Sequence, residues 1–231
     1  MMKRSRRIIV LNVTLFFIVC CLITYVIIFR ATASFPIQHI KVHGQYQHIK
    51  TADIQHLVAP YLRVSFFNVD LFAIKQALLT LPWLESASVT RVWPSTLNIV
   101  LQERRPVAIW NGDHLMTQEA VLFSANVENF LNTLPILLGP RGTEEEMLKK
   151  CSEFNEILSP LGLHIHQLRL TSNRVWSIRL DNDVELMLGE NNADERLRRF
   201  VGVYTKIVTS NRSRAKRFDL RYGDGVAVAW Q

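Results

Sequence analysis

The feature that most constrains this chain is an uncharged apolar run of 22 residues from Ile8 to Phe29. A helix of that length reaches about 33 Å, enough to cross a bilayer core of about 30 Å. Four cations lie in the seven residues before the run, and Arg30 alone follows it closely. Because positive charge stays on the cytoplasmic side, this asymmetry predicts a cytoplasmic tail at 1–7, one transmembrane helix at 8–29 and an exported remainder.

A cleaved signal peptide is the alternative for this run. Ala31-Thr32-Ala33 has the small-x-small form of a cleavage site. The run is longer than the roughly 7–15 apolar residues of a signal core, and Arg30 separates it from the alanines. We therefore expect the run to be retained as a membrane anchor.

The positive net charge of the chain comes largely from the residues that set its membrane topology, and it does not indicate a polyanionic partner. The formal net charge is +7, and the segment 1–30 holds five Lys and Arg residues and no acid. The rest of the chain has 22 basic and 20 acidic residues, a net charge of +2. No concentrated cationic stripe remains there, so we expect no nucleic-acid partner.

The segment after the apolar run predicts the order strand–helix–helix–strand–strand. Alternating apolar residues at 37–43 predict the first strand, and apolar residues at helical spacing predict a helix from about 51 to 62. Asp70 can cap a second helix that Pro82 stops. Strands at 86–92 and 97–102 follow, joined by a turn at Trp93-Pro94. Phe66 and Phe67 are expected in the core of this segment, and the alternative is that they seal its two helices.

Short strands dominate the segment after residue 106, and two amphipathic helices interrupt them. One helix is predicted at 144–158, where Cys151 lies on the apolar stripe as a buried small hydrophobe. The other helix carries apolar residues at helical spacing from Leu197 to Val208. The predicted fold class is α+β, with an antiparallel sheet and two helices in this second domain. The strands are expected at 107–111, 114–116, 121–123, 165–170, 175–180, 184–188, 218–222 and 226–230.

The run LPWLESASVTRVWPSTLNIVLQERRPVAIW at 81–110 resembles the end of a POTRA domain of the FtsQ/DivIB family of bacterial cell-division proteins. Four later blocks are similar to that family in the same order: LPILLGP (134–140), RVWSIRLDNDVELMLG (174–189), RLRRFVGVY (196–204) and FDLRYGDGVAVAW (218–230). The resemblance covers nearly the whole chain. It implies a βααββ POTRA domain at 35–105 and a C-terminal β domain at 106–231.

The resemblance also implies a docking site at the last strand for the division subunits FtsB and FtsL. A strand at a sheet edge has unpaired backbone groups that a partner segment can extend. Carried over by motif, Arg221 would pair with an acidic partner residue, and Tyr222 and Trp230 would be aromatic anchors. The alternative is that both aromatics only close the core. The full predicted set is Arg174, Arg221, Tyr222, Gly225, Val226, Val228 and Trp230.

A second interaction surface is expected near the second POTRA strand, at Val89, Arg91, Trp93 and Pro94, for other division proteins. The transmembrane helix is a further contact for them. By family resemblance the chain is expected in a Gram-negative inner membrane at the division septum. Its N-terminus would be cytoplasmic and its C-terminus periplasmic, linking cytoplasmic division components to septal wall synthesis.

No catalytic motif is visible: there is no G-x-S-x-G elbow, Walker A loop, H-E-x-x-H or Cys/His cluster at zinc spacing. We therefore expect no enzyme activity, cofactor or metal. The histidines are expected to face solvent, and Arg196, Arg198 and Arg199 to lie on the wet side of their helix. Two other classes stay open: an anchored periplasmic cell-wall hydrolase, and a POTRA-bearing secretion or assembly factor.

Overall fold

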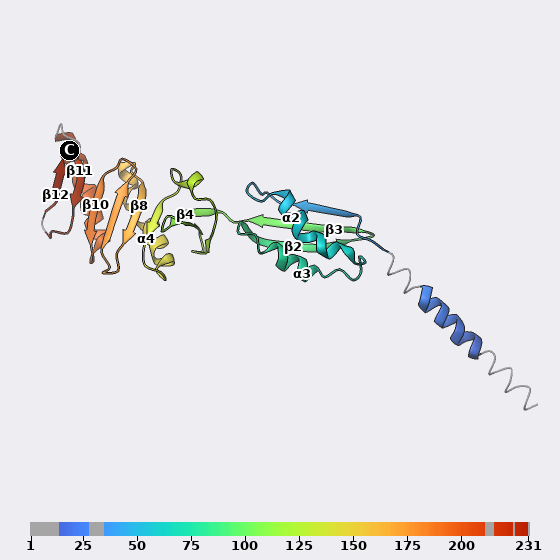
Figure 1. Ribbon diagram of the computed structural model, residues 1–231. Coiled ribbons are helices and arrows are strands. Elements are labelled where there is room, and N and C mark those ends of the chain that lie inside the picture. The colour runs from blue at the N-terminus through green and yellow to red at the C-terminus, as the bar shows by residue number, and fades with distance from the viewer. Residues whose placement is uncertain (1–13, 28–34, 211–214, 224, 231) are drawn as a thin grey trace, which may run out of the picture. The chain divides into compact units, whose positions relative to one another are not determined.

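The computed structural model describes residues 14–27, 35–210, 215–223 and 225–230 (Figure 1). The chain divides into two compact units, Met1–Glu103 and Arg104–Gln231. Each unit has its own hydrophobic core. The two units are therefore described separately.

The apolar run is helical over residues 14–27. Thr24 Oγ1 donates to the carbonyl oxygens of Cys20 and Cys21 at 2.9 Å, so this polar side chain is satisfied within its own helix. Within the described ranges, no helix has both the length and the apolar character needed to cross a membrane. The other residues of the predicted span, 8–13 and 28–29, lie outside those ranges, and the span stays a prediction.

The first unit has the predicted βααββ order. β1 runs parallel to β3, and β2 is antiparallel to β3, giving the sheet order β1-β3-β2. The elements are β1 (His39–His43), α2 (Thr51–Val58), the 3₁₀ turn η1 (Ala59–Arg63), α3 (Leu71–Leu78), β2 (Leu84–Val92) and β3 (Thr96–Glu103). The Trp93–Pro94 peptide bond between β2 and β3 is cis.

Helix boundaries in this unit follow local chemistry. The Asp70 carboxylate accepts the Ala73 N–H at 2.9 Å, which confirms the predicted cap of α3. The first helix is shorter than predicted: it ends at Val58 and continues as a 3₁₀ turn, because Pro60 has no N–H to donate. Phe66 is buried as predicted, but Phe67 is 46% exposed, so its placement in the core was wrong.

Not all histidines of this unit face solvent freely. The His48 ring stacks on Trp83 with the ring centroids 3.9 Å apart, and its Nδ1 lies 3.5 Å from the Glu103 carboxylate. The same carboxylate accepts the backbone N–H groups of Gln47 and His48 at 2.9 and 2.8 Å. The end of β3 is thereby fastened to the loop before α2.

The second unit is a nine-stranded mixed sheet with the order β12-β11-β10-β9-β8-β7-β4-β5-β6. The prediction of an antiparallel sheet was wrong for three pairs, because β4/β7, β7/β8 and β10/β11 are parallel. Helix α4 lies in the crossover from β7 to β8 and α5 in that from β10 to β11, as parallel neighbours require.

The elements of this unit are β4 (Pro106–Trp110), β5 (His114–Thr117), β6 (Leu122–Phe123), η2 (Glu128–Phe130), β7 (Ile136–Leu138), α4 (Glu144–Leu158), η3 (Ser159–Leu161), β8 (Ile165–Leu170), β9 (Trp176–Leu180), β10 (Glu185–Gly189), α5 (Ala193–Ser210), β11 (Ala215–Asp219) and β12 (Ala227–Trp230). The predicted bounds of α4 and β8 are confirmed.

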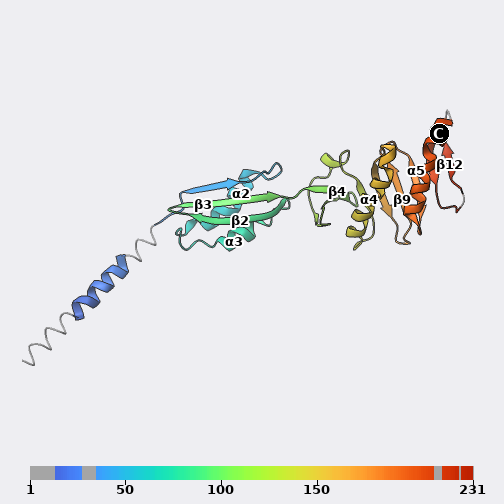
Figure 2. The ribbon, with the colours of Figure 1, turned by 180° about the vertical axis from the view of Figure 1, so that it is seen from behind.

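Helices α4 and α5 lie side by side over the sheet (Figure 2). Cys151 on α4 is buried, as predicted, and burial raises the pKa of its thiol to about 11. From α5, Phe200 packs edge-to-face on Phe218 of β11 with the ring centroids 5.0 Å apart. Lys150 Nζ reaches Asp194 at 3.0 Å and joins the two helices at their surface. These contacts fix α5 against the strands that lead to the end of the sheet.

Candidate functional site: a docking edge at the last strand

Strand β12 is the outermost strand of the large sheet. It pairs antiparallel with β11, in a register that places Val228 opposite Phe218 and Trp230 opposite Ala215. Among the described residues, no strand pairs with its other side. The backbone groups on that side can therefore accept an added strand.

The two faces of β12 differ in burial. Val226, Val228 and Trp230 are partly buried and pack against the core of the unit, whereas Ala227 and Ala229 are exposed. Trp230 thus contributes to closing the core, which is the alternative that the sequence left open for it. Because Ala227 and Ala229 are small, the exposed face of β12 leaves room for larger side chains on a neighbouring strand.

Tyr222 lies in the loop before β12 and is 59% exposed. Gly225, in the same loop, is also exposed. The structure therefore separates the two predicted aromatic anchors: Tyr222 projects to solvent, and Trp230 packs inward. Among the described residues between 104 and 230, the other exposed large apolar side chains are Val121 and Leu131, and both are less exposed than Tyr222.

An arginine from α5 holds this loop in place. The Arg199 guanidinium donates to the carbonyl oxygens of Leu220 at 3.2 Å and Tyr222 at 3.0 Å, and also to that of Gly223. Arg196 donates in the same way to the Leu188 carbonyl at the end of β10. The prediction that Arg196 and Arg199 lie on a wet helix face was wrong, because carbonyls at and beyond the strand ends bind their donors.

Arg221 already has an acidic partner within the chain. Its Nε and Nη2 donate to the Asp219 carboxylate at 2.6–3.1 Å, and its backbone N–H donates to Asp219 Oδ1 at 3.1 Å. The hydrogen bond from Arg221 lowers the pKa of Asp219 below its ordinary value. The Arg221 side chain is about half exposed. A carboxylate from a partner would have to share or replace Asp219.

Arg174 lies at the same end of the sheet. Trp176 of β9 pairs with Gly189 of β10, and Met187 of β10 pairs with Asp219 of β11. The start of β9 and the end of β11 are therefore separated by two strand spacings, about 10 Å. Arg174 has a positive φ and grips Glu146 of α4 with two hydrogen bonds of 2.8 and 2.5 Å. These bonds lower the pKa of Glu146. We call β12, Tyr222, Arg221 and Arg174 the docking edge.

The four residues of the second predicted surface do not form one patch. Val89 is partly buried and packs against the core of the first unit. Arg91 donates to the carbonyls of Phe66 at 3.0 Å and Val69 at 2.6 Å, so its guanidinium is used inside the unit. Trp93, at 76% exposure, and Pro94 project from the turn.

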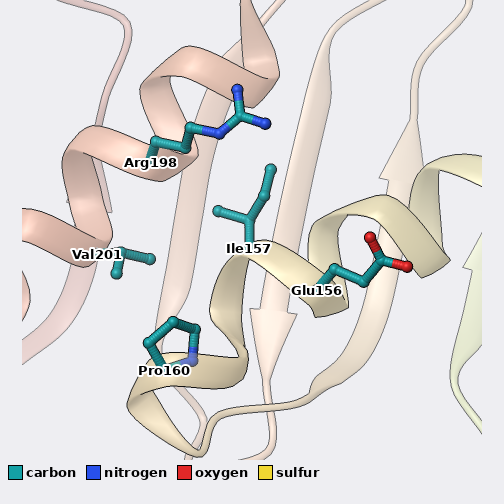
Figure 3. Close-up of a pocket in the computed structure, with 5 residues that line it drawn as sticks. All are labelled: Glu156, Ile157, Pro160, Arg198 and Val201. Atoms are coloured by element: carbon teal, nitrogen blue, oxygen red, sulfur yellow. The ribbon is translucent and has the colours of Figure 1, made fainter.

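A shallow hollow lies between α4 and α5 (Figure 3). Glu156, Ile157, Pro160, Arg198 and Val201 line it. The Glu156 carboxylate points away from Arg198 in this view. Across the residues that the structure describes, no cluster of three His, Cys, Asp or Glu side chains is placed to hold a metal ion.

Comparisons with known proteins cover both units. A POTRA domain, FtsQ-type, matches residues 35–104, and "Cell division protein FtsQ/DivIB, C-terminal" matches residues 108–221. The cell division protein FtsQ of Coxiella burnetii is 36% identical over 198 residues, which cover 86% of this chain and 82% of that protein. The chain belongs to the FtsQ/DivIB family.

Other FtsQ proteins show the same extent of similarity. That of Shewanella oneidensis is 34% identical over 198 residues, 86% of this chain and 75% of its own. That of Aliivibrio fischeri is 31% identical over 197 residues, 85% of this chain and 77% of its own. The resemblance seen in the sequence is confirmed. The match to the C-terminal FtsQ/DivIB domain ends at Arg221, so β12 lies beyond it and its role in docking stays a prediction.

Proposed function

We propose that this chain is a non-catalytic division protein with a single membrane span, and that it binds an FtsB–FtsL pair at the docking edge. The observation that carries this proposal is the position of β12: it ends the sheet order, and among described residues its outer side has no strand partner. Membership of the FtsQ/DivIB family supports the division role over a secretion or assembly factor.

Strand addition explains how the edge would bind. A partner segment in extended conformation pairs its backbone with β12, and its side chains on the exposed face lie beside Ala227 and Ala229. Tyr222 supplies an exposed aromatic surface close to the strand, of the kind that often dominates interface energy. Backbone pairing and Tyr222 give affinity, while the arginines select the partner.

The arginines of the edge favour an acidic partner. Arg221 and Arg174 are each about half exposed, and their carboxylate partners, Asp219 and Glu146, also contact solvent. Because exposed ion pairs contribute little to stability, an incoming carboxylate can take over either guanidinium at small cost. These charges therefore determine the register in which the added strand pairs, and they contribute little to its affinity.

Membrane topology completes the proposal. The cations before residue 8 keep the tail in the cytoplasm, the run at 8–29 spans an inner membrane, and both folded units lie in the periplasm. The protein then connects cytoplasmic division components at the septum to wall synthesis outside the membrane. Family membership and the charge asymmetry support this arrangement.

Binding of full-length protein in nanodiscs to a purified FtsB–FtsL pair tests the proposal. Tyr222→Ala should weaken binding at least about 30-fold, equivalent to about 2 kcal/mol. Ala229→Glu should also weaken it, since a carboxylate would lie in the path of an acidic strand. Val121→Ala, which truncates an exposed apolar side chain elsewhere in the unit, is the matched control. Equal binding by all four proteins would refute the docking edge.

A further inference from the structure

Exposed apolar side chains gather at one end of the POTRA unit. Residues 35–103 have seven large hydrophobic side chains that are strongly exposed. Six of them belong to the segment before β1, the loop between η1 and α3, the first turn of α3 and the end of β2. These six are Phe35, Val64, Phe67, Phe72, Val92 and Trp93, and we call them the apolar end. The seventh, Val100, lies within β3.

Direct contacts join the first members of this group. The Phe66 N–H donates to the Phe35 carbonyl at 2.8 Å, and Pro36 forms an isolated bridge with Ser65. The Phe35 and Phe67 rings pack edge-to-face with their centroids 5.9 Å apart. The segment that enters the unit and the loop after η1 therefore share one end.

The β2–β3 turn belongs to the same end. The Ser95 carbonyl accepts the Gln38 N–H at 2.9 Å, next to the start of β1. Arg91 binds the carbonyls of Phe67 at 3.4 Å and Val69 at 2.6 Å, which holds the loop before α3 beside the end of β2. Figures 1 and 2 both show this turn and the start of β1 at the end of the sheet opposite to the exit of β3.

Chain length ties this end to the apolar run. Phe35 follows Phe29 by six residues, which span at most about 20 Å when fully extended. The chain leaves the unit at the other end, because Glu103 pairs with Leu84 at the start of β2. The nine residues of β2 place that exit about 30 Å from Trp93.

We propose that the apolar end of the POTRA unit rests on the lipid headgroup layer of the membrane. This proposal depends on the membrane anchoring put forward above. Aromatic side chains are the residues that membrane interfaces favour, and four of the six are Phe or Trp. Arg63, exposed beside Val64, suits anionic headgroups. The short tether supplies a high effective concentration, so weak insertion of a few side chains suffices.

A lipid surface explains the group better than a division protein does. The side chains come from four separate segments of the unit, and no single helix or strand presents them together. Their shared property is position, at the end where the chain arrives from the apolar run. With this end on the lipid, the POTRA unit would present its exit, at Glu103, away from the membrane.

Quenching of tryptophan fluorescence by brominated lipids tests the proposal on the full chain. The protein is incorporated into nanodiscs of phosphatidylethanolamine and phosphatidylglycerol with a brominated fraction, and excited selectively at tryptophan. The predicted span contains no tryptophan. Trp93→Phe should remove most of the lipid-dependent quenching. Trp83→Phe, at the opposite end of β2, is the matched control and should leave the quenching unchanged.

The outcomes separate this proposal from the proposed function. Incorporated protein whose quenching is absent, or is the same with and without Trp93, overturns lipid contact and leaves the anchor standing. Failure of the chain to incorporate into nanodiscs overturns the anchor and, with it, the lipid contact. A Phe67→Ser/Phe72→Ser variant that keeps its circular dichroism should reduce quenching of Trp93. If this variant instead loses binding to a division protein while quenching persists unchanged, the surface is a protein contact.

Discussion

Three arginine side chains hold the polar contacts of the docking edge, each with a different kind of partner. Arg174 binds a carboxylate on a helix, Arg221 binds a carboxylate two residues away, and Arg199 binds backbone carbonyls of the loop before β12. The first two are exposed enough to exchange partners. Arg199 is instead a positioning residue, because it sets the backbone that carries Tyr222.

Replacing Arg199 by Ala should weaken partner binding about tenfold, equivalent to about 1.4 kcal/mol, without removing any residue of the edge itself. The carbonyls of Leu220 and Tyr222 would lose their donors, and the loop would move more freely. Hydrogen exchange should then rise at the loop amides. Arg198→Ala, an exposed neighbour on α5, is the control. If hydrogen exchange and binding were unchanged in Arg199→Ala, the hydrogen bonds of Arg199 to the loop before β12 would have no role in partner binding.

Cys151 should be unreactive while the second unit is folded. Burial raises the pKa of its thiol from an ordinary 9.0 to about 11, which lowers the thiolate fraction at neutral pH about 100-fold. In a Cys20→Ser/Cys21→Ser background, a maleimide should label the chain only after denaturation. Rapid labelling of native protein would contradict the burial of this side chain.

Local sequence patterns predict the role of a side chain correctly where that role depends only on its own helix or turn. Asp70 and Cys151 have the predicted roles. Phe67 and Arg199 do not, for related reasons. Periodicity cannot tell which of two adjacent phenylalanines faces inward in a loop, nor that a guanidinium beside an apolar stripe will bend towards unpaired carbonyls. The one available signal was that Arg196 and Arg199, spaced by three, flank the buried Leu197 and Phe200 on α5.

At the scale of elements, the crossover connections determine which neighbouring strands of the large sheet are parallel. Strong stripes allow α4 to be predicted with its bounds, and the three residues between the predicted strands at 175–180 and 184–188 are too few for anything but the antiparallel pair that β9 and β10 form. The parallel pairs were missed because β7 (Ile136–Leu138) was not among the predicted strands and the two helices were not treated as crossovers. A helix between two strands favours a parallel pair, and β7–α4–β8 and β10–α5–β11 both follow that rule.

Glu185 links three strands and should make the second unit sensitive to acid. From β10 it accepts hydrogen bonds from Arg217 of β11 at 2.7 and 3.0 Å and from Arg179 of β9 at 3.0 Å. These bonds lower the pKa of Glu185, so its stabilisation is complete above the pKa of the unfolded chain and is lost as pH falls through the lower folded value.

The free energy of unfolding of this unit should therefore fall as pH drops below about 5. Glu185→Gln should remove about 0.5–1 kcal/mol at neutral pH and flatten the acid dependence. Denaturant titrations across this range measure both effects. A variant with the same acid slope as wild type would show that other carboxylates carry the dependence.

At the scale of the whole molecule, the two separate cores predict two separate unfolding transitions, and a substitution in one core should shift only one of them.

Gly44 offers such a substitution in the POTRA unit. It follows β1 with a φ of +143°, and a Cβ there would overlap the Leu101 carbonyl of β3. Gly44→Ala should thus destabilise the POTRA unit by about 2 kcal/mol or more.

Calorimetry of the Gly44→Ala variant should show a lower Tm for the first unit and an unchanged Tm for the second. The docking edge should then keep its affinity for a partner, since it lies wholly in the second unit. An equal fall in both transitions would mean that the two units unfold as one.

The most direct test of strand addition is hydrogen exchange along β12 in full-length protein, with and without a purified FtsB–FtsL pair. Strand pairing should protect amides between 226 and 230 on binding, together with the Tyr222 loop. Binding that leaves β12 unprotected and protects another surface, such as the hollow between α4 and α5, would contradict the docking edge.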